Sequence, residues 1–515
     1  MSKPLKLPIG LQDFNEVIGG GYLYVDKTQY IHRLLTSGKY YFLSRPRRFG
    51  KSLTLSTISY LYRGRSELFQ GLWLEGQWDW GKTQPVVHIS FSSIGYRTLG
   101  LEAAIAAELR SISQRMGIAL QEQEIDRQFH ELLRQLAQRD GKVVLLVDEY
   151  DKPLIDFLDD LPQAQANQQT LKIFYSVIKD SDAYLEFMLI TGVSKFSKVS
   201  IFSDLNHLKD LTFDRHYAAL VGYTQAELEQ YFEPYMAEVE AYQGMGRPAL
   251  LEKVRAWYNG YSWDGRTRVY NPFSILCFFS AGDFRNFWFE TGTPTFLLKL
   301  LKEQHLYKLD NLEASERSFA SYDIESLQAV PILFQTGYLT IKAKDGLGTY
   351  TLDYPNAEVR EALLEYIISD LRHTQTPFST PLVVDLYKAF AANDLERVIM
   401  LVKSIFKTIP SQIFIANAEH YYHSLIYLVF FYLGLYTESE VNTSDGRLDC
   451  VVKTPAHIYV IEFKLDKSAA AALRQIKDKG YAERYRADSR EKVLVGVNFS
   501  SEAKTVEGWK AETLG

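Results

Sequence analysis

Three consecutive residues, Gly50, Lys51 and Ser52, have the groups that a phosphate-binding loop needs. Backbone N–H groups at a glycine turn can point at phosphate oxygens, an ammonium can reach the β- and γ-phosphates, and a hydroxyl can hold Mg²⁺. An apolar, aromatic run from Tyr40 precedes them and is typical of a strand. A helix predicted over 53–62 would point its N-terminal dipole at the anion. These residues predict a strand, a phosphate cradle and a helix, in that order.

The spacing departs from the usual GxxxxGK[ST] pattern at its first glycine, where Arg45 stands. A helix start that merely follows a basic turn is therefore an alternative, and the loop needs support from residues elsewhere in the chain. If it binds a nucleotide, the contacts come from the run Arg48, Phe49, Gly50, Lys51, Ser52 and Leu53.

Support comes from a carboxylate pair, Asp148 and Glu149, which ends a strand of five consecutive apolar residues over 143–147. Parallel sheets hold Mg-ATP at this end of their strands. We expect Asp148 to hold Mg²⁺ with Ser52, and Glu149 to polarise the attacking water. Thr191, after another apolar run, is the candidate for sensing the γ-phosphate. An acidic turn and an ordinary strand-end threonine are the alternatives, but the combination with the loop favours a nucleotide site.

The order of elements predicts an α/β chain in four segments. Strands and amphipathic helices alternate over 1–215, which predicts a P-loop NTPase core (AAA/STAND-like) with a parallel sheet. A helical lid is expected over 216–300, with a capping box in its first helix. A mixed α/β linker follows over 301–403, either winged-helix-like or a simple connector. The last segment, 404–515, is predicted to be a restriction-endonuclease-like α/β domain.

This last segment contains a predicted hairpin whose two strands meet at the turn 454–457. Centring the turn between Pro455 and Ala456 places Asp449 directly opposite Glu462, with their Cβ atoms about 4.5–5.5 Å apart on one face. Two carboxylates at that distance repel each other unless a cation lies between them. The opposite face is apolar, so a divalent metal is the simplest interpretation.

Lys464 shares the face of Glu462, because strand side chains repeat every second residue. Its ammonium could orient a metal-bound water or stabilise charge on a phosphate. Glu419 could add a third carboxylate to the metal site. A zinc site with His420 and His423 is less favoured, because an H-x-x-H pair without further ligands is usually structural.

The helix predicted after the hairpin, 469–485, contains Arg474, Gln475 and Lys477. From residue 464 to 492 there are nine Lys or Arg against five Asp or Glu, a local excess that could follow a phosphate backbone. A solvated helix surface is the alternative. The predicted partner is nucleic acid, DNA before RNA.

Composition limits the remaining classes. The chain of 515 residues has a net charge of −6, so any contact with nucleic acid must be a local patch. The first residues lack the apolar core of a signal peptide, no apolar run reaches the ~20 residues of a membrane span, and two cysteines suggest reduced thiols. We expect a cytoplasmic protein without a membrane partner, which could form a homo-oligomer.

Several stretches resemble the AAA-ATPase-like family of bacterial and archaeal proteins: RPRRFGKSL, LVDEYDKPL, TGVSKFSKVSIFSDLNHLKDL, WYNGYSWDG with VYNPFSIL, and WFETGTPTFLL. The resemblance covers roughly residues 1–300 and implies a P-loop ATPase related to AAA and STAND switches. It also accounts for Arg45, because the loop of that family typically reads RPRRFGKS. The tryptophan- and tyrosine-rich motifs are expected to pack the lid.

The spacing of Glu419, Asp449 and Glu462-x-Lys464 resembles the PD-(D/E)xK nuclease superfamily, whose domain is often fused to that ATPase family. This resemblance implies that Gln475 braces the active site. The leading hypothesis is an ATPase that controls a nuclease through ATP, with Mg²⁺ (or Mn²⁺) as cofactor, and the family suggests defence or mobile elements. The alternatives are a STAND-like switch or remodeller that binds nucleic acid without cutting it, and an interaction scaffold.

Overall fold

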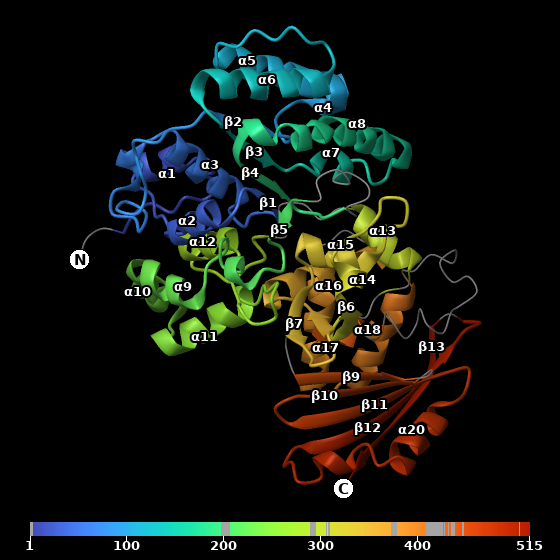
Figure 1. The fold of residues 1–515 in the computed structure, drawn as a ribbon. Helices are drawn as coiled ribbons and strands as arrows, with labels where there is room; N and C mark the ends of the chain where they lie inside the picture. The colour runs from blue at the N-terminus through green and yellow to red at the C-terminus, as the bar shows by residue number, and fades with distance from the viewer. Residues whose placement is uncertain are drawn as a thin grey trace. The chain divides into compact units, whose positions relative to one another are not determined.

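A parallel five-stranded sheet lies at the centre of the N-terminal half of the chain (Figure 1). The computed structural model describes residues 4–196, 207–288, 295–304, 306, 309–371, 379–407, 426, 428–430, 432–433, 438–444, 447–503 and 505–514. The chain divides into two compact units, one of residues 1–300 and 309–359 and the other of 301–308 and 360–515. The division falls inside helices α13 (Thr295–Glu303) and α16 (Ala357–Leu371).

The strands of the first sheet lie in the order β2-β3-β4-β1-β5, and every pair is parallel. Their bounds are β1 Tyr40–Ser44, β2 Val86–Ser90, β3 Val143–Asp148, β4 Leu185–Gly192 and β5 Lys209–Asp210. β1 and β3 are buried along their whole length, as expected of apolar strands covered on both faces. The predicted α/β class is therefore confirmed.

Helices connect and cover these strands. α1, α3 and the pairs α5–α6 and α6–α8 pack on the sheet or on one another. The bounds are α1 Phe14–Gly19, α2 Thr28–Ser37, α3 Lys51–Tyr62, α4 Tyr96–Leu99, α5 Leu101–Arg115, α6 Ile125–Asp140, α7 Lys152–Ile155 and α8 Leu161–Asp180.

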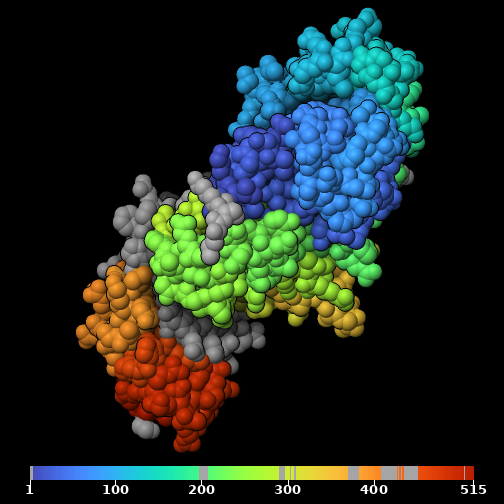
Figure 2. Space-filling model, turned by 90° about the vertical axis from the view of Figure 1, so that its left-hand side faces the viewer, coloured from blue at the N-terminus to red at the C-terminus, as the bar shows by residue number. Residues whose placement is uncertain are grey.

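The segment predicted to be a helical lid contains α9 Gln225–Tyr231, α10 Glu233–Gln243, α11 Arg247–Tyr258 and α12 Pro272–Ala281. Thr224 and Glu227 form the predicted capping box at the start of α9. The lid helices share an apolar core with Leu23 and Val25 of the N-terminal segment. Figures 1 and 2 show these green helices beside the blue N-terminal residues. These helices are therefore packed against the chain that precedes the predicted phosphate-binding loop.

A small antiparallel sheet of order β6-β8-β7 completes the first unit. Its elements are β6 Leu312–Ser315, α14 Glu316–Phe319, α15 Ala329–Thr336, β7 Thr340–Lys344 and β8 Thr349–Asp353. The helix, turn and strand expected over 331–341 are α15, a left-handed Gly337 and β7.

The second unit is built on a mixed sheet of order β13-β12-β11-β10-β9, in which only β11 and β12 run parallel. α20 packs on β11, β12 and β13. The elements are α17 Ser379–Ala391, α18 Leu395–Lys407, β9 Glu438–Ser444, β10 Arg447–Lys453, β11 His457–Leu465, α20 Ala469–Asp478, β12 Glu491–Ser500 and β13 Thr505–Leu514.

The helix predicted over 469–485 is shorter than expected. α20 ends at Asp478, because Gly480 adopts a left-handed conformation (φ 62°), and a single 3-10 turn follows over Glu483–Tyr485. Arg474, Gln475 and Lys477 remain on α20. Among the helices that the structure describes, none combines the length and the apolar character needed to span a bilayer.

Candidate functional site

Asp148, at the end of β3, joins the phosphate-binding loop to the neighbouring strand. Its Oδ2 accepts a 2.5 Å hydrogen bond from Ser52 Oγ on the first turn of α3. Its Oδ1 accepts one of 2.6 Å from Thr191 Oγ1 on β4. Ser52 and Thr191 are both among the residues predicted for the nucleotide site, and the three side chains meet at the ends of the parallel strands. The hydroxyl and the carboxylate are the hard oxygen ligands that Mg²⁺ prefers.

The loop before α3 has the form of an anion cradle. Gly50 is left-handed (φ 93°) and caps α3, and a Cβ built on it would contact nothing within 4 Å, so one side of the turn is open. Lys51 Nζ donates to the backbone carbonyls of Arg45 (2.9 Å) and Pro46 (3.0 Å). Burial lowers the pKa of Lys51, and nearby carboxylates partly oppose that shift.

Two carboxylates follow Asp148 and differ in environment. Glu149 is half-buried and lies in the left-handed region (φ 51°), a strained backbone that is typical of functional positions. Asp151 is buried, and its Oδ2 accepts from the N–H groups of Val193 (2.9 Å) and Ser194 (2.5 Å). Burial raises the pKa of Asp151 to about 6, although these hydrogen bonds and Lys51 oppose the shift.

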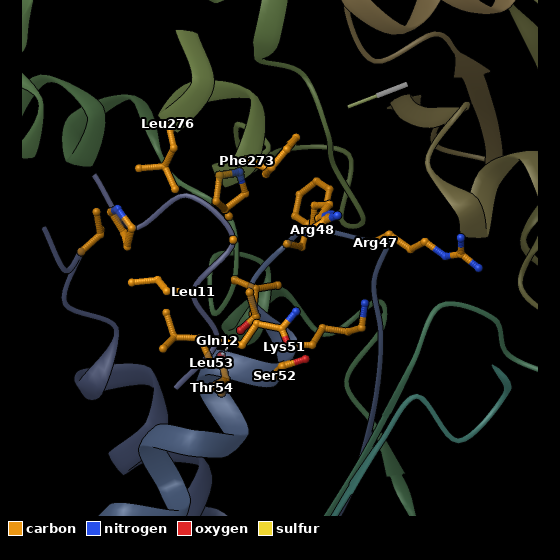
Figure 3. Close-up of a pocket in the computed structure, with 18 of the residues that line it drawn as sticks. Leu11, Gln12, Arg47, Arg48, Lys51, Ser52, Leu53, Thr54, Phe273 and Leu276 are labelled. Atoms are coloured by element: carbon orange, nitrogen blue, oxygen red, sulfur yellow. Dashed lines mark hydrogen bonds between the residues drawn. The ribbon is translucent and has the colours of Figure 1, made fainter. Parts of the chain in front are cut away.

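A cavity of about 410 Å³ opens in front of the loop, within the range of small-molecule sites. Figure 3 shows Lys51 and Ser52 at the start of α3, with Phe273 and Leu276 of α12 facing the same space. All the predicted loop contacts line it, together with Glu149: Arg48, Phe49, Gly50, Lys51, Ser52 and Leu53. Asp148 and Thr191 are not among the lining residues and reach the cavity only through Ser52.

The other walls of the cavity are mainly apolar. They come from four segments distant in sequence and include Leu11, Leu23, Val25, Leu220, Val221, Phe273 and Leu276. None was predicted, because an apolar residue in the cavity has the same sequence signature as one in the core. Asp13 and Phe14 attach the first segment to α3: Phe14 N–H donates to Ser56 Oγ (2.9 Å), and this hydroxyl donates to Asp13 (3.2 Å).

The second candidate site lies on the predicted hairpin of β10 and β11. The strands are antiparallel, and Asp449 is paired with Glu462 in the register expected from the turn. Glu462 is fully buried, and its Oε1 accepts hydrogen bonds from Lys464 Nζ (2.6 Å) and Gln475 Nε2 (2.5 Å). Lys464 is 8% exposed. Glu462 therefore lies at the centre of a buried polar group in the second unit.

The predicted nucleic-acid residues on α20 differ from one another. Gln475 points at Glu462 and so belongs to the polar group, whereas Arg474 is exposed. Lys477 is exposed and forms an ion pair with Glu512 on β13. A nucleic-acid phosphate would have to compete with that carboxylate for Lys477.

Part of the second site lies outside the described residues. Glu419, His420 and His423 fall there, as does the side chain of Asp449. In the part of the chain that the structure describes, no group of three or more His, Cys, Asp or Glu is arranged to hold a metal. The carboxylate of Glu462 is an oxygen ligand of the kind that divalent metals bind, whereas the Lys464 ammonium and the Gln475 N–H group beside it are not ligands.

Comparisons with known proteins match two parts of the chain to known families. Residues 8–202 match a family model described as a predicted AAA-ATPase of the AAA-ATPase-like family. Residues 417–509 match the PD-(D/E)XK nuclease superfamily. A protein of Azotobacter chroococcum mcd 1, described as "Uncharacterized protein in vnfD 5'region", is 42% identical over 525 residues, which cover 99% of each chain.

Among solved structures, the Aeropyrum pernix ORC1 protein in complex with DNA is similar to this chain at 12% identity. The similarity covers 67% of this chain and 94% of the ORC1 chain, with a TM-score of 0.28.

Proposed function

The chain belongs to the AAA-ATPase-like family and carries a C-terminal PD-(D/E)XK nuclease superfamily domain, and from this we propose an ATPase that controls a metal-dependent nuclease. The first unit would bind and hydrolyse ATP. The second would cleave nucleic acid, with DNA as the proposed substrate. A role in defence or in the biology of mobile elements belongs to the same proposal.

The observation that carries the ATP site is the pair of hydrogen bonds from Ser52 and Thr191 to Asp148. In this proposal, backbone N–H groups of the loop and Lys51 bind the phosphates, and the apolar walls hold the nucleobase. Ser52 and Asp148 would hold Mg²⁺, which neutralises charge on the β- and γ-phosphates when bound.

Glu149 is the proposed base that orients the attacking water. It lines the cavity at the end of β3, and its backbone lies in the strained left-handed region. Thr191 is the proposed sensor, because its hydroxyl contacts Asp148 from the adjacent strand β4. Its movement would be transmitted to the metal-binding carboxylate.

The nuclease proposal rests on the pairing of Asp449 with Glu462 and on the contact of Lys464 with Glu462. Asp449 and Glu462 would hold a divalent metal, with Glu419 as a further proposed ligand, and the metal would activate water and stabilise phosphate charge. Lys464 would orient the nucleophile, and Gln475 would hold Glu462 in place. A protein that only binds nucleic acid has no need of a buried lysine on the metal-binding face.

The test is to incubate the purified full-length protein with DNA or RNA, Mg²⁺ or Mn²⁺, and with or without ATP. We expect ATP hydrolysis and metal-dependent cleavage whose rate changes with ATP. Binding of nucleic acid without cleavage, with intact ATP hydrolysis, would favour the STAND-like switch instead. Absence of both nucleotide binding and cleavage would contradict the proposal.

A further inference from the structure

Arg45 stands where the phosphate-binding pattern usually has its first glycine, and its side chain is buried (1% exposed). Nη1 donates to the carbonyls of Ser44 (2.8 Å) and Thr212 (3.0 Å). The guanidinium carbon lies 4.0 Å from the ring centroid of Trp263, a cation–π contact. Among the described residues, Nε and Nη2 of Arg45 have no hydrogen-bond partner.

The backbone does not require a glycine at this position. The non-glycine residues with positive φ include Arg48 (φ 68°) but not Arg45. The left-handed turns of the loop therefore fall at Arg48 and Gly50, near α3, and not at its start. An arginine can occupy position 45 without backbone strain.

The lid contacts the loop through aromatic side chains. The ring of Phe49 makes edge-on contacts with the rings of Tyr261 and Trp263, at distances of 4.9 Å and 5.4 Å between ring centroids. Trp288 Nε1 donates to the carbonyl of Arg47 (3.3 Å). These aromatic residues come from the motifs WYNGYSWDG and WFETG, which were expected only to pack the lid. They contact the phosphate-binding loop itself.

We propose that Arg45 and Trp263 are positioning residues that hold the phosphate-binding loop in its nucleotide-binding shape. The inference rests on the proposed ATP site. Neither residue lines the cavity. Each therefore acts by fixing the backbone of the loop that carries Lys51. The link is direct, because the carbonyl of Arg45 accepts the hydrogen bond from Lys51 Nζ.

Burying a cation is costly, which argues for a role beyond general stability. Burial lowers the pKa of Arg45 to about 9, with Asp210 and Asp264 opposing the shift, so the side chain stays charged at neutral pH. An apolar side chain of similar volume would avoid this cost. The charged guanidinium of Arg45 makes two hydrogen bonds and one ring contact, and these contacts fix the position of the loop.

The sharpest test is Arg45→Gly, because it restores the usual GxxxxGK[ST] pattern. We expect ATP with a fluorescent ribose label, in the presence of Mg²⁺, to bind at least about tenfold more weakly to this variant than to the wild type. Equal or tighter binding would overturn the inference. If the wild type itself binds no labelled ATP, the proposed ATP site fails instead, so the two failures are distinguishable.

A second variant separates position from stability. Arg45→Met keeps the volume but removes the buried charge, so we expect an equal or higher melting temperature together with about tenfold weaker binding. A purely structural role predicts that melting temperature and affinity fall together, and that result would overturn the inference. Unfolding of every Arg45 variant would also overturn it, because the residue would then support the whole fold.

The lid side of the contact has a matched control. Trp263→Leu should weaken binding about tenfold, and Trp263→Phe, which keeps a ring, should recover most of it. Trp257 is a half-buried lid tryptophan that packs on Phe284 and does not line the cavity, so Trp257→Leu should leave affinity within about twofold. An equal loss in Trp257→Leu and Trp263→Leu would contradict the inference.

Discussion

The Ser52 hydroxyl donates a 2.5 Å hydrogen bond to Oδ2 of Asp148, and so joins the first turn of α3 to the end of β3. The two residues lie far apart in sequence, but the parallel sheet brings their oxygens together. This contact gives the proposed Mg²⁺ site its two protein ligands. Lys51 and Glu149 line the cavity, whereas Asp148 lies behind Ser52. Lys51 and Glu149 are therefore placed to act on the nucleotide, and Asp148 is placed to act through Ser52.

Lys51→Ala should weaken ATP binding by about 10- to 100-fold, because a charge-assisted contact to phosphate is lost. Calorimetric titration of Mg-ATP into the full-length variant measures this. Lys82, an exposed lysine before β2, gives the control Lys82→Ala, which should bind as the wild type does. Unchanged affinity in Lys51→Ala would exclude the lysine from the site.

Glu149→Gln should bind ATP with nearly wild-type affinity but hydrolyse it at least about 100-fold more slowly, since a neutral amide cannot accept the water proton. Affinity and phosphate release are measured on the same preparation. The matched control is Glu102→Gln, on the exposed side of α5. Hydrolysis at the wild-type rate in Glu149→Gln would show that another group orients the water.

Ionisation of Asp151 should lower the free energy of unfolding as the pH rises from about 4 to 6. Burial raises its pKa to about 6 in the folded protein, so the fold favours the protonated form, and this contribution is lost as the carboxyl ionises. The change for this group is on the order of 3 kcal/mol.

Chemical unfolding without nucleotide, compared between wild type and Asp151→Asn, measures the effect. The asparagine should flatten the dependence of stability on pH over this window, because it cannot ionise but can still accept from the N–H groups of Val193 and Ser194. An unchanged slope in Asp151→Asn would assign the pH dependence to other carboxylates.

Asp449→Ala and Glu462→Ala should both abolish cleavage and weaken Mn²⁺ binding, but they should differ in stability without metal. Removing Asp449 relieves repulsion, so stability holds or rises slightly. Removing Glu462 leaves the buried Lys464 without its 2.6 Å partner, which costs about 3 kcal/mol or more. This second sign comes from the buried contact and is opposite to what repulsion alone would predict.

Calorimetric titration of Mn²⁺ into full-length Asp148→Asn isolates the second metal site. Adding Asp449→Ala to that background should lower the Mn²⁺ affinity, whereas Asp478→Ala, on the exposed end of α20, should not. Equal affinity with and without Asp449 would sink the metal-site interpretation, and the strand register would then be a coincidence.

Lys464→Ala should abolish cleavage while Mn²⁺ binds as tightly as before or more tightly, because a cation next to Glu462 has been removed. ATP hydrolysis should continue at the wild-type rate, since the residue belongs to the other unit. Cleavage assays and the same Mn²⁺ titration, done in parallel, check the split. Loss of metal binding together with cleavage would make Lys464 a structural support of Glu462.

The sequence alone was sufficient for the features that depend on near neighbours. Strand alternation and a two-residue turn centre determined that Asp449 pairs with Glu462, because the side-chain period of a strand is two. Apolar runs determined the buried strands β1 and β3, and the Gly-Lys-Ser order marked the start of α3. The helix 469–485 was overextended because Gly480 was not read as its stop.

Only the tertiary structure decided which distant residues surround the loop. The apolar walls of the cavity come from four segments. The ring of Trp263 contacts the guanidinium of Arg45, although the two residues lie far apart in the sequence. The bond of Gln475 to Glu462 is likewise a packing result, set by how α20 lies on the sheet. Such contacts depend on how whole elements pack, and no local period or spacing in the chain encodes that arrangement.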